Sequence, residues 1–408
     1  MKTPNRGIIL SAAVAVGLVT GTSYVWSIFR NPLMQAHGWD ANEVTLAYSL
    51  FMLFVLVGSI AVGPLLRKIK PSLVVFIGGL LQGIGFLLTG FIGELFLLYL
   101  CYSFLAGFGN GLLYNGAIVT ATRWFPDRKG MANGLTVGAM GLAPLLFAPV
   151  GNAFISLFDV FTSFKLMGLI MIVVFSIVAW FIKAPAEGWT PKGWVPSTTV
   201  NVSTRNYNLG QMLKTPLFYV SWLMVVCAIC AASMMTSNAS PIAQQMVGIT
   251  PEQGALMVGL FALISFCGRF ILAALSDKLG RFNTILVAMI LIAADMLFFF
   301  TRADSFVTFL VVMGVVGFCF GGIMAMLPGY VSDIYGQKNF ATNYPFIYSG
   351  FTTSSFIGPL IVSGFLVSTG NYDGAFLAAG IMTCAGIVLV LIARALDKGM
   401  RKKADAGS

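Results

Sequence analysis

Charged residues are scarce in this sequence, and histidine is almost absent. Asp, Glu, Lys and Arg make up 9% of the 408 residues, against roughly 25% in an ordinary soluble domain, and there is one histidine. A chain of this length that is 58% hydrophobic has too little polar surface to fold in water. We therefore expect a membrane protein. The lack of clustered ligands or nucleophiles also predicts no metal, no cofactor and no enzyme active site.

Neither the cysteines nor the excess of cations indicates redox chemistry, a metal or a nucleic-acid partner. All six cysteines lie inside apolar runs, which is typical of a small hydrophobic residue in a packed helix. Cys227 and Cys230 form a C-x-x-C pair, but no histidine or second pair accompanies it. The net charge of +10 comes from Lys and Arg in short loops, not from a basic stripe, so we expect no nucleic-acid partner.

Twelve apolar runs are each long enough to cross a bilayer as a helix, which takes about 20 residues. We interpret the first run as a retained span, since no convincing cleavage site follows it. The sequence thus predicts an all-α membrane protein with an N-terminal six-helix half (1–182), a cytoplasmic linker (183–216), a C-terminal six-helix half (217–395) and a basic cytoplasmic tail (396–408). The runs are 7–28, 44–65, 72–92, 95–121, 131–157 and 163–182, and then 217–240, 253–275, 283–301, 305–331, 340–368 and 373–395.

The distribution of Lys and Arg between the loops predicts the orientation. If the N-terminus is cytoplasmic, 20 of the 24 cations fall on the inside, and only Arg30, Lys165 and Arg302 fall on the outside. Arg269 alone lies well inside an apolar run. Cytoplasmic loops are the ones enriched in Lys and Arg. We therefore expect a multi-pass protein of the bacterial inner (plasma) membrane with both termini in the cytoplasm.

The two halves repeat each other at a constant offset of 210 residues, without a reversal of orientation. This pattern predicts two parallel six-helix repeats with a cleft where they meet. The offset pairs Gly107 with Gly317, Gly111 with Gly321, Asn133 with Asn343 and Pro149 with Pro359.

At this point the chain resembles the major facilitator superfamily. The loop Asp277-Lys-Leu-Gly-Arg281 looks like the loop motif of that superfamily, and its counterpart at 67–70 lacks the acid. We interpret Asp277, Lys278 and Arg281 as a gating loop, whose charges can form interdomain bonds in one conformation and lose them in the other.

A narrower resemblance is to the oxalate/formate antiporter family, a relative of the monocarboxylate porters. It rests on three elements in the right order: Tyr24-Val-Trp-Ser-Ile-Phe, Arg123-Trp-Phe-Pro-Asp-Arg-Lys-Gly130 and the stretch 211–222. The resemblance implies a transporter that works by alternating access on a small organic anion.

Arg269 is the central candidate for binding that anion. An ion at the middle of a bilayer costs roughly 3 kcal/mol, so a buried arginine needs a partner or a polar cavity. One interpretation is a structural ion pair with an acid on another helix. The other is a substrate anchor, because a guanidinium binds a carboxylate through two parallel hydrogen bonds. The family resemblance favours the anchor.

Uncharged polar and aromatic residues complete the expected binding site. Ser23 and Tyr24 lie in the first run, and Tyr114 and Asn115 follow the glycine-rich stretch of the fourth. Hydroxyl and amide groups can hydrogen-bond a carboxylate without adding charge. In the family that the chain resembles, the positions that match Tyr24, Tyr114, Phe320 and Tyr348 surround the anion.

Two departures from the family bear on substrate and coupling. Phe351 stands where the oxalate exchanger carries a second cation, a lysine, and we expect no other buried cation in the chain. The predicted substrate is therefore a monocarboxylate such as lactate, pyruvate or formate. Ser265 stands where proton-coupled monocarboxylate porters often have an acid. Proton symport and anion exchange both stay open.

Asp295 is the second ionisable residue inside an apolar run, at 283–301. We interpret it as a buried acid that is hydrogen-bonded or protonated, and keep it as a candidate proton-linked residue. For the protein as a whole the alternatives are an oxalate/formate-type dicarboxylate exchanger, an anion channel and a transporter-like sensor. We expect a monomer in the lipid bilayer.

Overall fold

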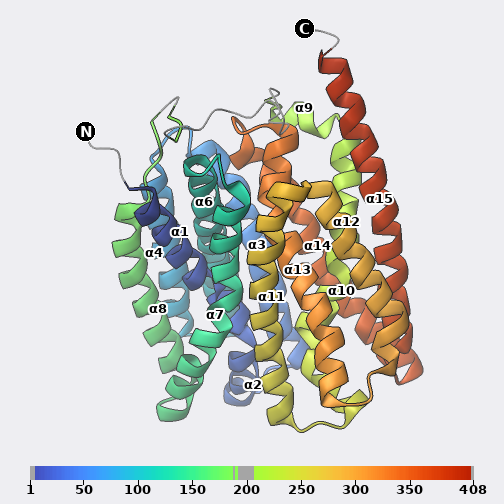
Figure 1. Ribbon diagram of the computed structural model, residues 1–408. Coiled ribbons are helices and arrows are strands. Elements are labelled where there is room, and N and C mark those ends of the chain that lie inside the picture. Colours follow the sequence, from blue (N-terminus) through green and yellow to red (C-terminus); the bar gives the residue numbers. More distant parts are fainter. Residues whose placement is uncertain (1–4, 187–188, 192–205, 406–408) are drawn as a thin grey trace. The chain divides into compact units, whose positions relative to one another are not determined.

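The computed structural model describes residues 5–186, 189–191 and 206–405 (Figure 1). Over these residues, 12 helices are long and apolar enough to cross a membrane, which confirms an all-helical protein with twelve spans. The spans are Arg6–Val25, Leu46–Leu65, Pro71–Thr89, Leu95–Trp124, Lys129–Leu157, Val160–Phe181, Pro216–Thr236, Leu256–Leu279, Arg281–Arg302, Phe306–Tyr335, Phe340–Leu366 and Asp373–Arg401.

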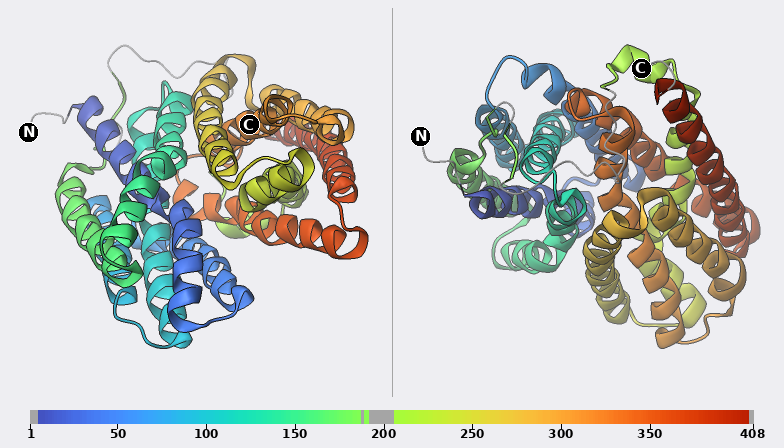
Figure 2. Two further views of the ribbon diagram at one scale, coloured as in Figure 1. Left: turned by 90° about the horizontal axis from the view of Figure 1, so that it is seen from below. Right: turned by 45° about the horizontal axis from the view of Figure 1, so that its top comes forward.

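The chain forms two compact units. The first contains Met1–Pro196 with Phe340–Pro345, and the second contains Ser197–Asn339 with Phe346–Ser408. The predicted linker, 183–216, lies partly outside the described residues, at 187–188 and 192–205. The domain limits drawn from the sequence stay a prediction. Figure 2 gives two further views of the helices in each unit.

The first unit is built from helices that pack in a few recurring pairs, such as α3 on α6, α4 on α8 and α1 on α7. Three of its spans are not regular α-helix throughout, because short 3₁₀ and π segments interrupt or end them. Its elements are α1 (Arg6–Thr20), the 3₁₀ segment η1 (Gly21–Val25), α2 (Trp26–His37), α3 (Ala41–Leu65), α4 (Pro71–Thr89), α5 (Leu95–Leu98), the π segment η2 (Tyr99–Ala106), α6 (Gly107–Trp124), α7 (Lys129–Leu157), α8 (Val160–Val178) and the 3₁₀ segment η3 (Ala179–Phe181).

The second unit repeats the pairing, with α11 on α13 and α12 on α15. Its last helix continues to Asp405, so the predicted basic tail is helical from residue 396 to that point. The elements of this half of the chain are α9 (Leu209–Leu213), α10 (Pro216–Val247), α11 (Pro251–Leu279), α12 (Arg281–Ala294), the π segment η4 (Asp295–Phe299), the 3₁₀ segment η5 (Phe300–Arg302), α13 (Phe306–Tyr335), α14 (Phe340–Thr369) and α15 (Asp373–Asp405).

Glycines make the same close helix contact in each unit, at positions 210 residues apart. In the first unit a Cβ atom on Gly111 of α6 would collide with the carbonyl oxygen of Val55 on α3. In the second, a Cβ atom on Gly321 of α13 would collide with the carbonyl oxygen of Ser265 on α11. Small residues at such contacts let helix backbones approach closely. The internal repeat is thus visible in packing, and the same relation holds for Gly58 with Phe108 and Gly268 with Phe318.

The Arg123–Gly130 element, which carried the family resemblance, ties together the two ends of the first unit. Asp127 forms an ion pair with Arg6 at the start of α1. The Arg6 guanidinium carbon also lies 4.3 Å from the centre of the Phe125 ring. The indole N–H of Trp124 donates to the carbonyl oxygen of Lys183, at 2.6 Å. The motif is therefore explained by packing in this unit.

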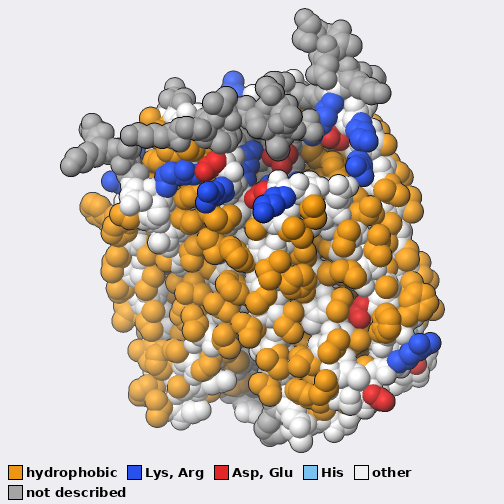
Figure 3. Space-filling view, in the orientation of Figure 1, with side chains coloured by type: hydrophobic (Ala, Val, Ile, Leu, Met, Phe, Trp, Pro, Cys, Tyr) orange, Lys and Arg blue, Asp and Glu red, His pale blue; other side chains and the backbone are white. Residues whose placement is uncertain are grey.

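On the face drawn in Figure 3, hydrophobic side chains cover most of the surface between the helix ends. On the face drawn, Lys and Arg gather near the ends of the helices, with few charges between them. Large apolar side chains are exposed along the spans, among them Leu169, Leu291 and Leu360. Such a surface is compatible with lipid, not with water.

Candidate functional site

Arg269 is buried in the second unit, on α11, with 4% of its surface exposed. Its guanidinium carbon lies 5.8 Å from the centre of the Phe320 ring on α13. The preceding residue, Gly268, has no room for a Cβ atom because the Phe318 carbonyl oxygen occupies that space. The close approach of α11 and α13 therefore places the arginine against an aromatic ring. A cation over a ring face is attracted by the ring quadrupole.

Three aromatic side chains extend from Arg269 across α13 and α14. The rings of Phe320 and Phe351 are stacked with centroids 6.5 Å apart, and those of Phe351 and Tyr348 lie 5.2 Å apart. The exposed fractions of Phe320, Phe351 and Tyr348 are 5%, 6% and 2%. The structure thus brings together four of the residues predicted from the sequence. We call Arg269, Phe320, Phe351 and Tyr348 the arginine–aromatic cluster.

Ser265 lies one helical turn before Arg269, on the same side of α11. It is 3% exposed. Its hydroxyl oxygen is buried without a hydrogen-bond partner among the residues that the structure describes. Ser265 stands at the position where proton-coupled monocarboxylate porters often have an acid, so a neutral hydroxyl replaces a carboxylate there.

Ser23 and Tyr24 lie in the 3₁₀ segment of the first span. The α-helical part ends at Thr20, and the 3₁₀ segment η1 follows. The hydroxyl of Thr22 donates to the Val19 carbonyl at 2.7 Å, a local bond that competes with the regular helical pattern. Ser23 is fully buried and Tyr24 is half-buried. Their role in binding stays a prediction.

Tyr114 and Asn115 are buried on α6, with 2% and 0% exposed. The Tyr114 hydroxyl lies 3.2 Å from the hydroxyl of Tyr344. The Asn115 side-chain nitrogen donates to the carbonyl oxygens of Ser59, at 2.7 Å, and Ala341, at 3.2 Å. All five residues belong to the first unit as the structure divides it. The Asn115 donors are therefore used by backbone, which leaves its amide oxygen for other contacts.

Two buried residues of the first unit, Trp26 and Tyr102, were not singled out in the sequence. Their rings stack with centroids 4.3 Å apart. The Trp26 indole nitrogen, the Tyr102 hydroxyl and the Ser23 hydroxyl are buried without hydrogen-bond partners within the described parts of the chain. One signal was available, since Trp26 follows Ser23 by three residues and shares its side of a helix. No local signal marked Tyr102.

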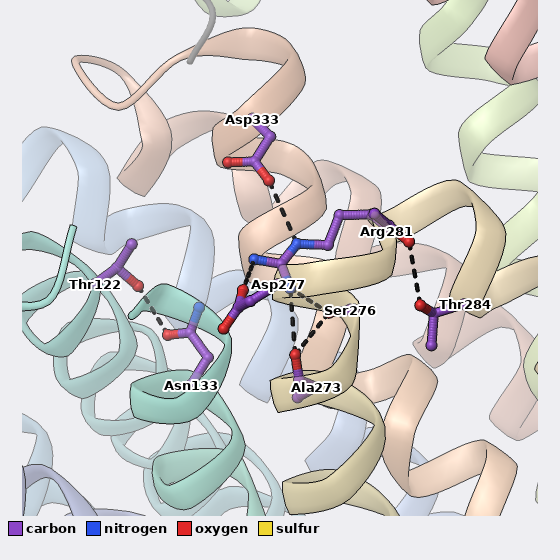
Figure 4. Close-up of polar contacts among 9 residues, drawn as sticks. Thr122, Asn133, Ala273, Ser276, Asp277, Arg281, Thr284 and Asp333 are labelled. Carbon is purple, nitrogen blue, oxygen red and sulfur yellow. Dashed lines mark hydrogen bonds and ion pairs between the residues drawn. The ribbon is translucent and has the colours of Figure 1, made fainter. Parts of the chain in front are cut away.

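Arg281 is the centre of a polar cluster at the end of α11 (Figure 4). It forms ion pairs with Asp277, at 2.5 Å, and with Asp333 of α13, at 3.3 Å. Lys278 is exposed. Gly280 has φ of 86° and ψ of 145°, a conformation that favours glycine and turns the chain into α12. These contacts lie within the second unit, and the predicted interdomain bonds of the loop stay a prediction.

The expectation that Arg269 is the only buried cation is wrong. Lys129 is 7% exposed. It is the first residue of α7, at the end of a span, where its aliphatic stem can pack on apolar neighbours while the ammonium lies toward the helix end. Lys129 belongs to the first unit, so it adds no cation to the arginine–aromatic cluster.

Asp295 begins the π segment η4, directly after α12. It is 4% exposed and interacts electrostatically with Cys319 of α13. The burial of Asp295 agrees with the buried acid that the sequence predicted. Its link to proton movement stays a prediction.

Comparison with known proteins identifies the family. The family model of the Major Facilitator Superfamily matches residues 11–303 and 226–407. The chain belongs to the Major Facilitator Superfamily. The oxalate:formate antiporter of Oxalobacter formigenes is 29% identical over 389 residues, which cover 94% of this chain and 90% of that protein. Monocarboxylate transporter 13 of Rattus norvegicus is 22% identical over 385 residues, 93% of this chain and 86% of that protein.

A solved structure of the same superfamily has a similar fold. The E. coli fucose:proton symporter FucP matches with a TM-score of 0.71 and 15% identity, over 94% of this chain and 98% of that chain. The major facilitator fold predicted from the sequence is therefore confirmed. The chain is a multi-pass membrane transporter related to the oxalate:formate antiporter and the monocarboxylate transporters, and not an enzyme.

Proposed function

We propose that this major facilitator protein is a secondary active transporter of a small monocarboxylate, such as lactate, pyruvate or formate, and that it works by alternating access. Arg269 binds the carboxylate. The observation that carries the proposal is the burial of Arg269 beside the Phe320 ring, which lies 5.8 Å away. A guanidinium in a water-poor site binds a carboxylate through charge-assisted hydrogen bonds, which are about twice as strong as neutral ones.

The preference for one carboxylate follows from what surrounds the arginine. Phe351, whose ring lies 6.5 Å from the ring of Phe320, offers an apolar face in place of a second cation. A dianion would bring its second carboxylate against aromatic carbon. An unpaired buried charge costs about 3–5 kcal/mol, and 3 kcal/mol already exceeds a hundredfold in affinity.

We keep Tyr348 of the second unit and Ser23, Tyr24, Tyr114 and Asn115 of the first unit as proposed substrate-binding residues. These side chains are buried or half-buried and carry hydroxyl or amide groups. They would orient the polar atoms of the substrate without adding charge. Asp277, Lys278 and Arg281 would act as the gating loop.

Coupling by proton symport or by anion exchange fits this site. Ser265 supplies no acid beside Arg269, so a substrate carboxylate would itself neutralise the arginine. The asymmetry of Lys and Arg supports a bacterial inner membrane protein with both termini in the cytoplasm. We propose that it acts as a monomer without a cofactor.

A dicarboxylate exchanger is the second candidate, because the relative that is 29% identical bears the name oxalate:formate antiporter. Phe351 argues against it. An anion channel or a transporter-like sensor would show no saturable counterflow, which distinguishes both from an alternating-access transporter.

The test is counterflow in liposomes that contain the purified protein. Preloaded lactate, pyruvate or formate should accelerate uptake of the same labelled anion, with saturation. Arg269→Ala should reduce this uptake at least a hundredfold, and Arg269→Lys should restore part of it because the charge returns without the planar fork. Arg302→Ala, an exposed arginine of the same unit, is the matched control and should be unchanged. Oxalate counterflow as fast as that of lactate would overturn the monocarboxylate proposal.

A further inference from the structure

Asp295 lies at a break in the ninth span. The regular helix α12 ends at Ala294, and the π segment η4 runs from Asp295 to Phe299. Single π turns inside α-helices are frequently found at functional sites. Asp295 is 4% exposed, so its carboxyl group lies inside the protein at a point where the backbone is already irregular.

Among the residues that the structure describes, no cation is found to balance a negative charge on Asp295. The elements packed on η4 are α12, α13, α15 and η5. Among their described residues, Cys319 of α13 is the titratable side chain that interacts with Asp295, while Arg302 of η5 and Cys384 of α15 are exposed. The Oδ2 atom of Asp295 has no hydrogen-bond partner within residues 206–405.

An open apolar groove of about 440 Å³ runs beside this position. Residues of α11, α12 and α13 line it, among them Ile264, Leu291, Gly314 and Cys319. Leu291 precedes Asp295 by four residues, near the end of α12. Cys319 both lines the groove and interacts with the carboxyl group. Because Leu291 and Cys319 line it, the groove borders the part of the second unit that holds Asp295.

These observations fit a neutral acid better than a carboxylate. An isolated charge in hydrocarbon costs roughly 3 kcal/mol or more, whereas a carboxylic acid is uncharged and can persist there. We propose that Asp295 is a proton-binding site of the second unit, held as a carboxylic acid and reached from the lipid side through the groove of Leu291, Gly314 and Cys319. This site does not involve Arg269, so it does not depend on the proposed substrate.

The apolar reagent dicyclohexylcarbodiimide tests this state directly, because it reacts with protonated carboxyl groups in apolar surroundings. The acid proton adds to one nitrogen of the carbodiimide, and the carboxylate oxygen forms a bond to the central carbon. The acyl group then migrates from oxygen to nitrogen and gives a stable N-acylurea. No leaving group and no oxidant are needed, so the labelled peptide gains the mass of one reagent molecule.

The experiment uses the full chain in liposomes and locates the modification by peptide mass spectrometry. We expect Asp295 to be labelled, and labelling to become slower as the pH rises. Asp295→Asn should abolish the adduct on that peptide, and Asp304→Asn, which changes an exposed acid outside the spans, should leave it unchanged. Arg269→Ala should leave it unchanged as well, which separates this test from that of the proposed function. Absence of the adduct, or equal labelling by a water-soluble carbodiimide, would overturn the proposal.

A second pair of variants tests the route of access. Leu291→Trp adds a larger side chain at a lipid-facing position of the groove, where Leu291 is 48% exposed. We expect it to slow the labelling of Asp295 severalfold. Leu391→Trp makes the same change on α15, where the leucine is 49% exposed, and should have no effect. Unchanged labelling in Leu291→Trp would refute access through the groove.

Discussion

The guanidinium carbon of Arg269 lies 5.8 Å from the centre of the Phe320 ring, and both side chains are buried in the second unit. Phe320 in turn stacks on Phe351, with ring centroids 6.5 Å apart. On the side of Phe320 and Phe351, Arg269 therefore has aromatic rings as neighbours and no second cation. This neighbourhood underlies the proposed selectivity for a single carboxylate.

Replacing Phe351 by lysine should widen the substrate range to dianions. Phe351→Lys would add a cation within the arginine–aromatic cluster, where it could pair with a second carboxylate. We expect oxalate affinity to rise at least tenfold, about 1.4 kcal/mol, and lactate affinity to fall. Phe351→Met is the control, because it alters shape without charge. Binding is measured by thermal shift in detergent and transport by counterflow; equal oxalate binding by all three proteins would contradict the argument.

Two glycines of α11 should respond in opposite ways to alanine. A Cβ atom on Gly268 would collide with the Phe318 carbonyl oxygen, whereas one on Gly259 would meet no atom within 4 Å. Gly268→Ala should therefore lower the free energy of unfolding by about 1–3 kcal/mol. Gly259→Ala should raise it by about 0.5–1 kcal/mol, since alanine favours a helix. Melting temperatures in one detergent check both, and a fall of equal size would argue against specific packing at Gly268.

Arg281 should stabilise the end of α11 through its two carboxylate partners. Arg281→Gln leaves Asp277 and Asp333 without their ion pairs, which measure 2.5 Å and 3.3 Å. We expect a loss of about 1–3 kcal/mol in stability, because hydrogen bonds to charged groups are worth about that much. Lys278→Gln, at an exposed neighbouring position, should change little. If both variants melt alike, the polar cluster contributes nothing specific to stability.

Asp159 should make the stability of α8 depend on acid pH. Its carboxylate accepts from the backbone N–H and the hydroxyl of Thr162, each at 2.7 Å, and these bonds lower the pKa of Asp159. Because the pKa of Asp159 is lower in the folded protein, the ionised carboxylate stabilises the fold fully when the pH is above the unfolded-state pKa of about 3.9. This stabilisation is lost as the pH falls through the lowered pKa of the folded state.

Asp159→Ala should accordingly melt at a slightly lower temperature than the wild type at neutral pH, and the difference should shrink as the pH falls below the ordinary pKa of aspartate. Asp159→Asn keeps a capping oxygen that does not titrate, so its deficit should be smaller at neutral pH. Melting temperatures across that pH range decide the matter. A deficit of Asp159→Ala that does not change with pH would contradict the assignment.

Much of the fold was predictable because a bilayer imposes simple requirements. Every run named in the sequence corresponds to a span in the structure, with ends that shift by several residues. The offset of 210 residues reappears as matching contacts of Gly111 with Val55 and of Gly321 with Ser265. The length and hydrophobicity of each apolar run and the positions of small residues are local properties, so they can be predicted from the sequence alone.

The irregular helix segments were not predictable in the same way. The 3₁₀ turn at Gly21–Val25 and the π turns at Tyr99–Ala106 and Asp295–Phe299 have no single sequence signature. These irregular segments depend on the packing of a helix against neighbouring helices. The stacking of Trp26 on Tyr102 joins residues 76 positions apart and arises only when the helices meet.

By itself, the sequence determined twelve spans with one arginine deep inside a span, since hydrophobic length and the cost of burying charge act on each segment separately. The transporter family came from the resemblance of its motifs to known proteins. Only the tertiary structure decided that the Arg269 guanidinium lies over the Phe320 ring, that the Phe351 and Tyr348 rings follow from there, and that Lys129 is buried. Those relations depend on packing between helices, where a side chain's neighbours come from distant parts of the chain.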